Sequence, residues 1–530
     1  MPASVMNFSR LLSDTARRLP ARPGLWQAEQ SWTWRELDDE TNAMAAAFRA
    51  LDLVPGDRVF VISRNNRPMF VNMWACFRAG LVWVPANFRL TPPEMAWLMR
   101  HCRARALVYD PAFQPHADAI MAEMKDAPPV VLALGAPRAG EQGWDALTLA
   151  HKGVPADEVE VDYDHPLWFF YTSGTTGRPK ASILTHGQMN FVVNNHLADL
   201  MPGTTEADVS LVVAPLSHGA GAHVLSQVAR GAMSVLLPSE RLDVEEAWRL
   251  VERHRISNMF TVPTIVKLLV EHPAVDRTDH RSLRFVIYAG APMYRADQKL
   301  ALQKLGPVLV QYFGLGEVTG NITVLPPHLH RPDDDAPDAR IGTCGYPRTG
   351  MEIKIVDGEN RRLAPGERGE ICVRGLAVFA GYFENSEATA KALRGGWFHT
   401  GDLGYLDAEG FLYITGRASD MYISGGSNVY PRDAEEVLLT HPAVSEVAVL
   451  GVPDPKWGEA GVAVVVRQSG AAAGEAELIG FLEGKLAKYK WPRRVFFWDE
   501  LPKSGYGKIP KHLIRQQLFA RGELREGQGI

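Results

Sequence analysis

Strands and helices alternate over the first part of the chain, and this alternation limits the fold more than any other feature of the sequence. Apolar runs at residues 58–62, 81–85 and 106–109 predict strands, and helical periodicity at 37–51 and 68–78 predicts helices. Strands that alternate with helices build a largely parallel sheet with helices packed on its faces. We therefore expect an α/β layer in this part of the chain.

The same alternation returns further along the chain, after an apolar run at 166–170 that predicts a strand and a helix start near Thr185. The predicted strands are 209–213, 234–237, 258–261 and 284–288, and the predicted helices are 223–230, 244–254 and 263–271. The sequence therefore predicts a second α/β layer, similar in build to the first.

The pattern changes near residue 330, where an acidic loop with prolines spans residues 330–338; we interpret it as a solvated loop rather than a metal site. Short strands at 351–356, 370–374 and 410–414 predict a small β-rich subdomain. Beyond about residue 420 the sequence predicts a compact α+β unit of ordinary domain size. Its predicted helices are 433–440 and 475–487, and its predicted strands are 444–452 and 461–467.

Size and charge narrow the class of protein. A chain of 530 residues is too long for one hydrophobic core, so two or more domains are expected. The net charge is −5, and without a basic excess nucleic acid is not expected as a partner. The sequence shows no signal-peptide pattern and no apolar run that could span a bilayer. Four cysteines without metal-ligand spacing predict a reduced, cytoplasmic protein, and a homodimer is left open as an assembly state.

One loop is rich in groups that bind phosphate. Residues 171–180 are Tyr-Thr-Ser-Gly-Thr-Thr-Gly-Arg-Pro-Lys and follow the strand predicted at 166–170. Glycines bring backbone N–H groups close to an anion, hydroxyls add donors, and the lysine adds a positive charge. The spacing is not the Walker pattern, which places a lysine directly after its second glycine. Taken alone, the loop is either a polyphosphate site or a polar surface turn between a strand and a helix.

Five motifs together resemble those of the adenylate-forming superfamily, which includes acyl-CoA synthetases, adenylation domains of peptide synthetases and luciferases. They lie at 172–180, 399–407, 416–417, 424–431 and 502–508, in the order that the family has. The resemblance implies a large N-terminal domain of two α/β subdomains and a small β subdomain, followed by a mobile α+β C-terminal domain. We expect the domains to be residues 1–417 and 418–530.

The resemblance also implies a reaction in two halves, as in an AMP-forming acyl-CoA synthetase. A carboxylate attacks the α-phosphate of ATP bound with Mg²⁺ and releases pyrophosphate, and coenzyme A then takes the acyl group and releases AMP. A carboxylic acid with a reference pKa of about 4.3 is already ionised near neutral pH, so the first half needs charge neutralisation and positioning, not a base. Two alternatives stay open, namely an adenylation enzyme that loads a carrier protein and a nucleotide-binding relative without catalysis.

Matching positions carry the family's functional residues into this sequence. Glu317 would hold Mg²⁺, and Lys508 would contact the carboxylate and the α-phosphate, although its local sequence alone is typical of a surface lysine. Asp402 would bind the ribose hydroxyls, and Arg417 would bridge ribose and phosphate. The other implied positions are Thr172, Ser173, Gly174, Thr175, Thr176, Gly177 and Lys180 at the phosphates, Gly290, Ala291, Pro292 and Phe313 at adenine, and Gly425 and Gly426 on the CoA side.

Three positions depart from the family pattern. Phe313 replaces a tyrosine and loses only a hydroxyl. Gly316 replaces a threonine whose hydroxyl is expected near the α-phosphate, so Thr319 or backbone N–H groups are expected to substitute. Ser419 stands at the hinge, where the family more often has Asp or Lys; about this hinge the C-terminal domain would rotate between the two halves of the reaction.

The acyl pocket is expected to be lined by residues 214–221, 288–291 and the start of 313–317. His218 is interpreted as a pocket residue that acts in the reaction rather than as a core histidine. The small residues that follow it, 219–221, predict a roomy cavity. None of the three segments contains Lys or Arg, which a buried second carboxylate would need, so a dicarboxylate is disfavoured. A medium-chain fatty acid and an aryl acid both fit.

Overall fold

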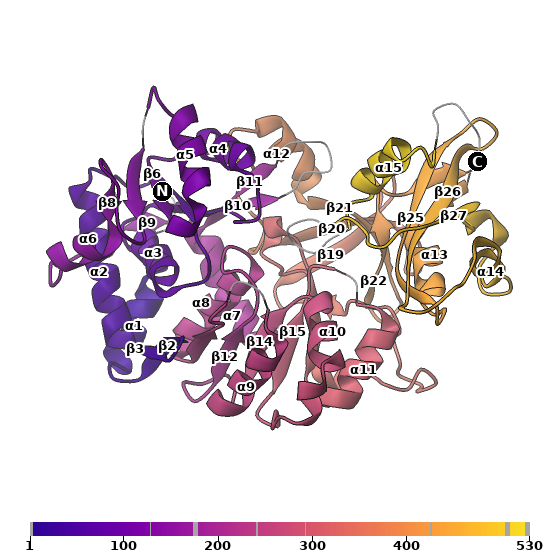
Figure 1. Ribbon diagram of the computed structural model, residues 1–530, viewed down its shortest axis with the longest axis horizontal. Coiled ribbons are helices and arrows are strands. Elements are labelled where there is room, and N and C mark those ends of the chain that lie inside the picture. Colours follow the sequence, from indigo (N-terminus) through magenta and orange to yellow (C-terminus); the bar gives the residue numbers. More distant parts are fainter. Residues whose placement is uncertain are drawn as a thin grey trace.

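The computed structural model of the protein describes residues 4–127, 129–172, 179–239, 242–291, 293–424, 427–503 and 509–524. The first α/β layer lies at one end of the molecule and the α+β unit at the other, with the second layer and a β sheet between them (Figure 1). This arrangement confirms the predicted fold class. None of the described helices is both long and apolar enough to cross a lipid bilayer.

The first sheet has a parallel centre, as the sequence predicted. Helix α2 (Trp34–Ala50) packs against α3 (Arg67–Arg78) on this layer, and it begins with a capping box in which the Glu36 N–H donates to Thr33 Oγ1 (3.2 Å) and the Thr33 N–H to Glu36 Oε2 (2.8 Å). The strands, in spatial order, are β11 (Lys180–Thr185), β10 (Pro166–Thr172), β5 (Val82–Pro85), β4 (Arg58–Ile62), β6 (Ala106–Tyr109), β7 (Val130–Ala133) and β8 (Gln142–Gly143).

The second sheet is the larger one and is also parallel at its centre. Its strands, in spatial order, are β18 (Tyr346–Pro347), β17 (Thr323–Leu325), β16 (Leu309–Phe313), β15 (Phe285–Tyr288), β14 (Asn258–Thr261), β12 (Val209–Val212), β13 (Met233–Leu236), β2 (Pro23–Gln27) and β3 (Gln30–Thr33). Its layer includes α7 (His186–Asp199), α8 (Gly219–Arg230), α9 (Val244–His254), α10 (Pro263–Glu271) and α11 (Arg295–Leu305). The predicted second α/β layer is confirmed.

The helix start predicted near Thr185 is confirmed, since Thr185 is the N-cap of α7, but two other local features differ from the prediction. Strand β11, which was not predicted, follows the phosphate loop and pairs antiparallel with β10 before α7 begins. No turn residue separates β11 from α7, so no local signal marks the strand. The helix predicted at 475–487 is shorter in the structure, where α14 spans Glu475–Gly480. It stops at Gly480 because glycine is a poor helix former, and Gly484 further along has a left-handed φ of +73°.

Apart from the short antiparallel pair β1 (Ser4–Val5) and β9 (Val161–Asp162), the remaining described strands form two sheets in which most neighbours are antiparallel. The predicted β subdomain is the sheet β19 (Met351–Val356), β20 (Gly369–Gly375), β21 (Phe398–Leu406) and β22 (Leu412–Arg417). The C-terminal sheet contains β23 (Tyr422–Ser424), β24 (Ser427–Val429), β25 (Val444–Asp454), β26 (Gly458–Arg467) and β27 (Arg494–Phe497), with α13 (Pro431–Leu438), α14 and α15 (Lys511–Ala520). Its apolar core draws on residues 434–518. The boundary after residue 417 falls between β22 and β23 and stays a prediction.

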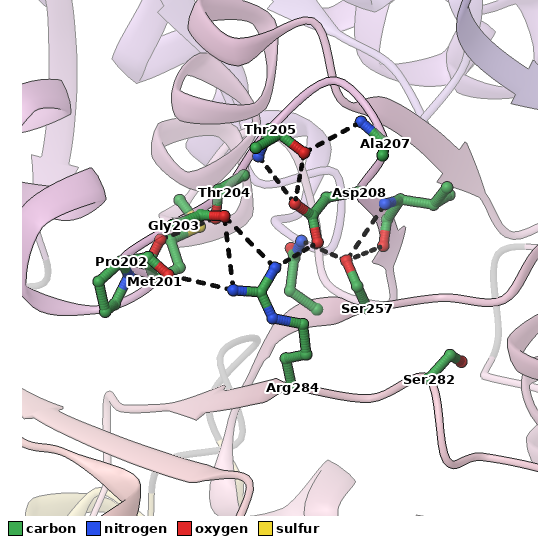
Figure 2. Close-up of polar contacts among 12 residues, drawn as sticks. Met201, Pro202, Gly203, Thr204, Thr205, Ala207, Asp208, Ser257, Ser282 and Arg284 are labelled. Atoms are coloured by element: carbon green, nitrogen blue, oxygen red, sulfur yellow. Dashed lines mark hydrogen bonds and ion pairs between the residues drawn. The ribbon is translucent and has the colours of Figure 1, made fainter.

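Arg284 ties the loop that follows α7 to the second sheet (Figure 2). Its guanidinium lies 2.9 Å from Oδ1 of the buried Asp208 and donates to the carbonyl oxygen of Pro202 at 3.2 Å. Oδ2 of Asp208 in turn accepts the Thr205 N–H at 2.8 Å. Arg284 and Asp208 together therefore hold the backbone of this loop at Pro202 and Thr205.

Arg284→Ala is expected to lower the free energy of unfolding by about 1–2 kcal/mol, because it leaves a buried carboxylate without its charged partner. The melting temperature of purified protein measures the loss. Arg281→Ala is the matched control, since the Arg281 side chain is 89% exposed and, among the described residues, pairs with the nearby Asp279 alone. Equal melting temperatures for the two variants would show that the Arg284 contacts contribute nothing.

Candidate active site

The positions predicted to surround adenine lie at one edge of the second sheet. Strands β15 and β16 are parallel neighbours, with Tyr288 opposite Gln311, so the residues that follow them meet at their carboxyl ends. Gly290 follows β15 and has a φ of +86°, a conformation that favours glycine. Ala291 comes next, and Phe313 ends β16. Pro292 lies outside the described residues.

A carboxylate with two hydroxyl partners lies where the phosphate loop leaves β10. Glu317 is only 6% exposed, and its Oε1 accepts the Thr172 hydroxyl at 3.2 Å and the Tyr382 hydroxyl at 2.9 Å. Burial and the neighbouring Glu317 raise the pKa of Tyr382, so the phenol stays protonated and donates. Glu317 Oε2 takes no hydrogen bond from the part of the chain that the structure describes. A carboxylate oxygen held in this way suits a hard cation such as Mg²⁺.

Tyr382 also reaches the last residue of the phosphate loop. Lys180 lies opposite Thr172 across β10 and β11, and its Nζ is 5.1 Å from the centre of the Tyr382 ring. Tyr382 therefore contacts Lys180 with its ring and Glu317 with its hydroxyl, and the sequence analysis did not predict either contact. Its partner Glu317 is 65 residues away in the chain, and nothing in the local pattern points to it. Residues 173–178, which include Ser173, Gly174, Thr175, Thr176 and Gly177, lie outside the described residues.

Asp402 and Arg417 face each other across β21 and β22. Arg417 Nε lies 3.0 Å from Asp402 Oδ1, and Asp402 is 5% exposed. Glu370 holds the segment before Asp402: its Oε1 accepts the Gly401 N–H at 3.2 Å, and its Oε2 lies 2.8 Å from Nδ1 of His399. The structure therefore brings together the two residues predicted to bind the ribose, and their part in binding it stays a prediction.

Glu370, Cys372 and His399 bring three groups of metal-binding type within 4.8 Å of one another. Cys372 Sγ lies 3.2 Å from His399 Nδ1 and 3.8 Å from Nε2, so the sulfur rests beside the ring rather than along one nitrogen lone pair. Burial and Glu370 raise the pKa of the Cys372 thiol to about 12, and Arg394 pairs with Glu370. We interpret the cluster as a support for Asp402.

His218 occupies the N-cap position of α8 without a side-chain capping hydrogen bond, and it lies beside the end of β10. The Ser217 hydroxyl is 2.7 Å from its Nδ1, and the ring meets Phe170 edge to face with centroids 5.5 Å apart. The helix starts earlier than predicted, at Gly219, because two glycines in its first turn weakened the helical signal. Phe170 is a second residue that sequence reasoning did not single out.

The space that a side chain would need at the two glycines that follow His218 is filled, so the small residues there allow close packing, and the roomy cavity stays a prediction. A Cβ on Gly219 would lie 2.6 Å from the Phe260 ring. A Cβ on Gly221 would lie 2.0 Å from the Leu216 carbonyl oxygen and 3.0 Å from Trp168. Aromatic rings therefore bound this region on two sides.

The expected substitute for the hydroxyl missing at Gly316 is engaged elsewhere. Thr319 Oγ1 accepts the Gln188 amide at 3.4 Å and lies 3.7 Å from Met189 Sδ, so it faces α7. Lys508, Gly425 and Gly426 lie outside the described residues, and their predicted roles stay predictions.

Comparison with known proteins places the chain in a family. Residues 12–383 match the family model of the AMP-binding enzymes, and residues 433–508 match the model of the AMP-binding enzyme C-terminal domain. The chain belongs to the AMP-binding, adenylate-forming enzyme family and is an enzyme of its acid–CoA ligase type. This confirms the resemblance inferred from the five motifs, and the family uses ATP, coenzyme A and Mg²⁺.

Similar proteins cover nearly the full length of the chain. A feruloyl-CoA synthase from Amycolatopsis sp is 35% identical over 95% of this chain and 97% of its own. A fatty acid–[acyl-carrier-protein] ligase from Streptomyces coeruleorubidus is 33% identical over 95% of each chain. Among solved structures, the o-succinylbenzoate CoA synthetase of Bacillus subtilis in complex with its acyl-adenylate intermediate superposes with a TM-score of 0.83 at 30% identity, covering 97% of this chain and 98% of its own.

Proposed function

We propose that the protein joins an aryl or a medium-chain fatty acid to coenzyme A through an acyl-adenylate. The arrangement along β10 is the observation that carries this proposal. Thr172 contacts Glu317, and two residues earlier Phe170 contacts His218. Residues two apart on a strand lie on the same face, so the phosphate site and the acyl site adjoin. In-line attack of a carboxylate on a phosphate requires this proximity.

In this proposal the chain positions two anions against each other. Backbone N–H groups and hydroxyls of residues 172–177 bind the phosphates, and Lys180 stays with the loop beside Tyr382. Gly290, Ala291, Pro292 and Phe313 hold adenine, while Asp402 and Arg417 hold the ribose. Glu317 holds Mg²⁺, which neutralises phosphate charge when it is bound.

The acid lies on the other side of the reacting phosphate. His218 and Phe170 border the carboxylate, and Lys508 contacts both the carboxylate and the α-phosphate while adenylation proceeds. The acyl-adenylate then meets the thiol of coenzyme A, with Gly425 and Gly426 facing the site after the C-terminal domain rotates about Ser419. The names of the relatives, which cover aryl and fatty acids, support the substrate class.

A panel of carboxylic acids tests the function. With ATP, Mg²⁺ and coenzyme A, we expect acid-dependent release of pyrophosphate and formation of acyl-CoA for aryl acids, medium-chain acids, or both. Short acids and dicarboxylates serve as the poor substrates. The absence of acid-dependent pyrophosphate release across the whole panel would contradict the proposal.

The choice of thiol separates the carrier-protein alternative from CoA ligation. The fatty acid–[acyl-carrier-protein] ligase among the relatives is the observation that keeps this alternative. Pyrophosphate release that needs an acid but yields no acyl-CoA, together with acylation of a phosphopantetheinylated carrier protein, would favour it. The third alternative, a relative without catalysis, predicts ATP binding with no pyrophosphate release.

Tyr382→Phe is expected to raise the Mg²⁺ concentration needed for half-maximal activity about tenfold, because a partner of the metal-binding carboxylate is lost. Electron paramagnetic resonance of Mn²⁺ titrated into the enzyme–ATP complex measures the affinity of the metal site without turnover, and the variant should bind Mn²⁺ more weakly. Tyr163→Phe is the control, since its hydroxyl donates to the Leu376 carbonyl oxygen at 3.4 Å, away from Glu317. A lower kcat with unchanged metal affinity would contradict this role for Tyr382.

A cytoplasmic location and a homodimer complete the proposal. The four cysteines are free and buried, which fits a reducing compartment. Light scattering during size-exclusion chromatography measures the mass of the protein in solution. A mass near the 58.5 kDa of one chain would exclude the dimer.

A further inference from the structure

Three alternate residues of β10 define a line that runs from the acyl site to the phosphate site. Trp168, Phe170 and Thr172 share one face of the strand, while Phe169 packs into a different core cluster on the other face. Trp168 lies against the position of Gly221, Phe170 lies against His218, and Thr172 contacts Glu317. Phe170 is therefore the middle residue of this line. It lies between the acyl site at His218 and the phosphate site at Glu317, where the carboxylate of the acid must meet the α-phosphate.

The Phe170 ring also occupies the space that a side chain at Gly316 would need. A Cβ at Gly316 would lie 2.6 and 2.8 Å from two carbons of the Phe170 ring and 2.8 Å from Thr172 Cγ2. The φ of Gly316 lies outside the left-handed region, so the backbone does not require glycine there. Glycine is required there because the Phe170 ring approaches the Gly316 backbone closely. We call Phe170 and Gly316 a matched pair, since the ring leaves no space for a side chain at residue 316.

We propose that Phe170 is a specificity-determining residue, which restricts the enzyme to acids that are unbranched or planar at the carbon next to the carboxyl group. The inference rests on the proposed function and deepens it. With the carboxylate held between His218 and the phosphate site, substituents on that carbon point toward the ring. A methyl group there has no room, whereas a flat aryl or alkenyl carbon, or a linear chain, passes beside the ring.

The chemical test uses pairs of acids that differ by one methyl group. 3-Phenylpropanoate is compared with 2-methyl-3-phenylpropanoate, and hexanoate with 2-methylhexanoate. One methyl group in a tight pocket changes kcat/KM by about 10- to 200-fold, so we expect the wild type to prefer the unbranched acid at least tenfold. Phe170→Val removes the ring carbons that approach Gly316 and should reduce the preference below threefold.

Phe169→Val is the matched control, because it makes the same change on the opposite face of the same strand. It should leave the preference for unbranched acids unchanged, even if it lowers stability more than Phe170→Val does. An enzyme that accepts acids from the panel but shows no such preference, or a preference that Phe170→Val leaves intact, overturns this inference and leaves the proposed function standing. An enzyme that accepts no acid overturns both.

Melting temperatures test the matched pair without any substrate. Gly316→Thr should lower the melting temperature by several degrees, since the new side chain must displace both Phe170 and Thr172. The same change made in Phe170→Val should lower it by less than half as much. Equal losses in the two backgrounds would show that Phe170 does not occupy the space beside Gly316, and would overturn the inference.

Discussion

Lys508→Ala is expected to slow formation of the acyl-adenylate by at least about 100-fold, the usual effect of removing one donor that stabilises charge in a transition state. Lys508 is assigned by its motif, and it would contact the carboxylate and the α-phosphate only during adenylation. Transfer of the acyl group from a supplied acyl-adenylate to coenzyme A should therefore continue at more than about a third of the wild-type rate, because Lys508 makes no contact that this step needs. Rapid-quench assays of the two half-reactions measure both rates.

Lys503→Ala controls for a nonspecific effect of removing a lysine from the same segment. Lys503 is partly exposed, and its Nζ lies 2.7 Å from Glu446 Oε1 within the C-terminal unit. This variant should keep both half-reactions. If Lys508→Ala slowed both half-reactions equally, the rotation of the C-terminal domain between them would lose its support.

Glu317→Gln is expected to lower the adenylation rate by about 100- to 1000-fold, because the neutral amide keeps the shape of the side chain but loses the charge that holds the cation. The amide oxygen can still accept the hydroxyls of Thr172 and Tyr382, so the fold around it should stay intact. Stopped-flow measurement of pyrophosphate release at saturating ATP gives the rate, and the melting temperature should change little.

Glu384→Gln is the matched control for the loss of a carboxylate near Tyr382. Glu384 is partly exposed and pairs with Arg103 at 2.8 Å, away from Thr172. It should retain the wild-type rate. A Glu317→Gln variant that releases pyrophosphate as fast as this control would exclude Glu317 from the metal and phosphate site.

The elements of the fold were predictable where a local signal marks them. Thr33 and Glu36 form the capping box that their spacing predicted, and β4, β6, β14, α9 and α10 have the predicted bounds. Strand β11 was missed because its pairing with β10 is a tertiary contact, and no turn separates it from α7. The start of α8 was placed too late because its first turn carries Gly219 and Gly221, which pack against Phe260 and Trp168.

The site was predictable only as far as its motifs extend. Thr172 and Glu317, which are 145 residues apart, were both predicted, and the structure brings them together. Tyr382 and Phe170 were missed, because a tyrosine or a phenylalanine in an apolar segment has no chemical signal of its own. Their importance comes from the partners that the fold supplies, which are Glu317 for Tyr382 and Gly316 and His218 for Phe170.

The central claim is that the carboxylate of the acid attacks the α-phosphate of ATP. An acid accepted in the panel, labelled with ¹⁸O in both carboxyl oxygens, tests it when the products are separated and weighed by mass spectrometry. We expect one ¹⁸O to pass into AMP and pyrophosphate to stay unlabelled, because the bond between the carboxyl carbon and the bridging oxygen breaks when the thiol attacks. Label in pyrophosphate or orthophosphate, with AMP unlabelled, would contradict it.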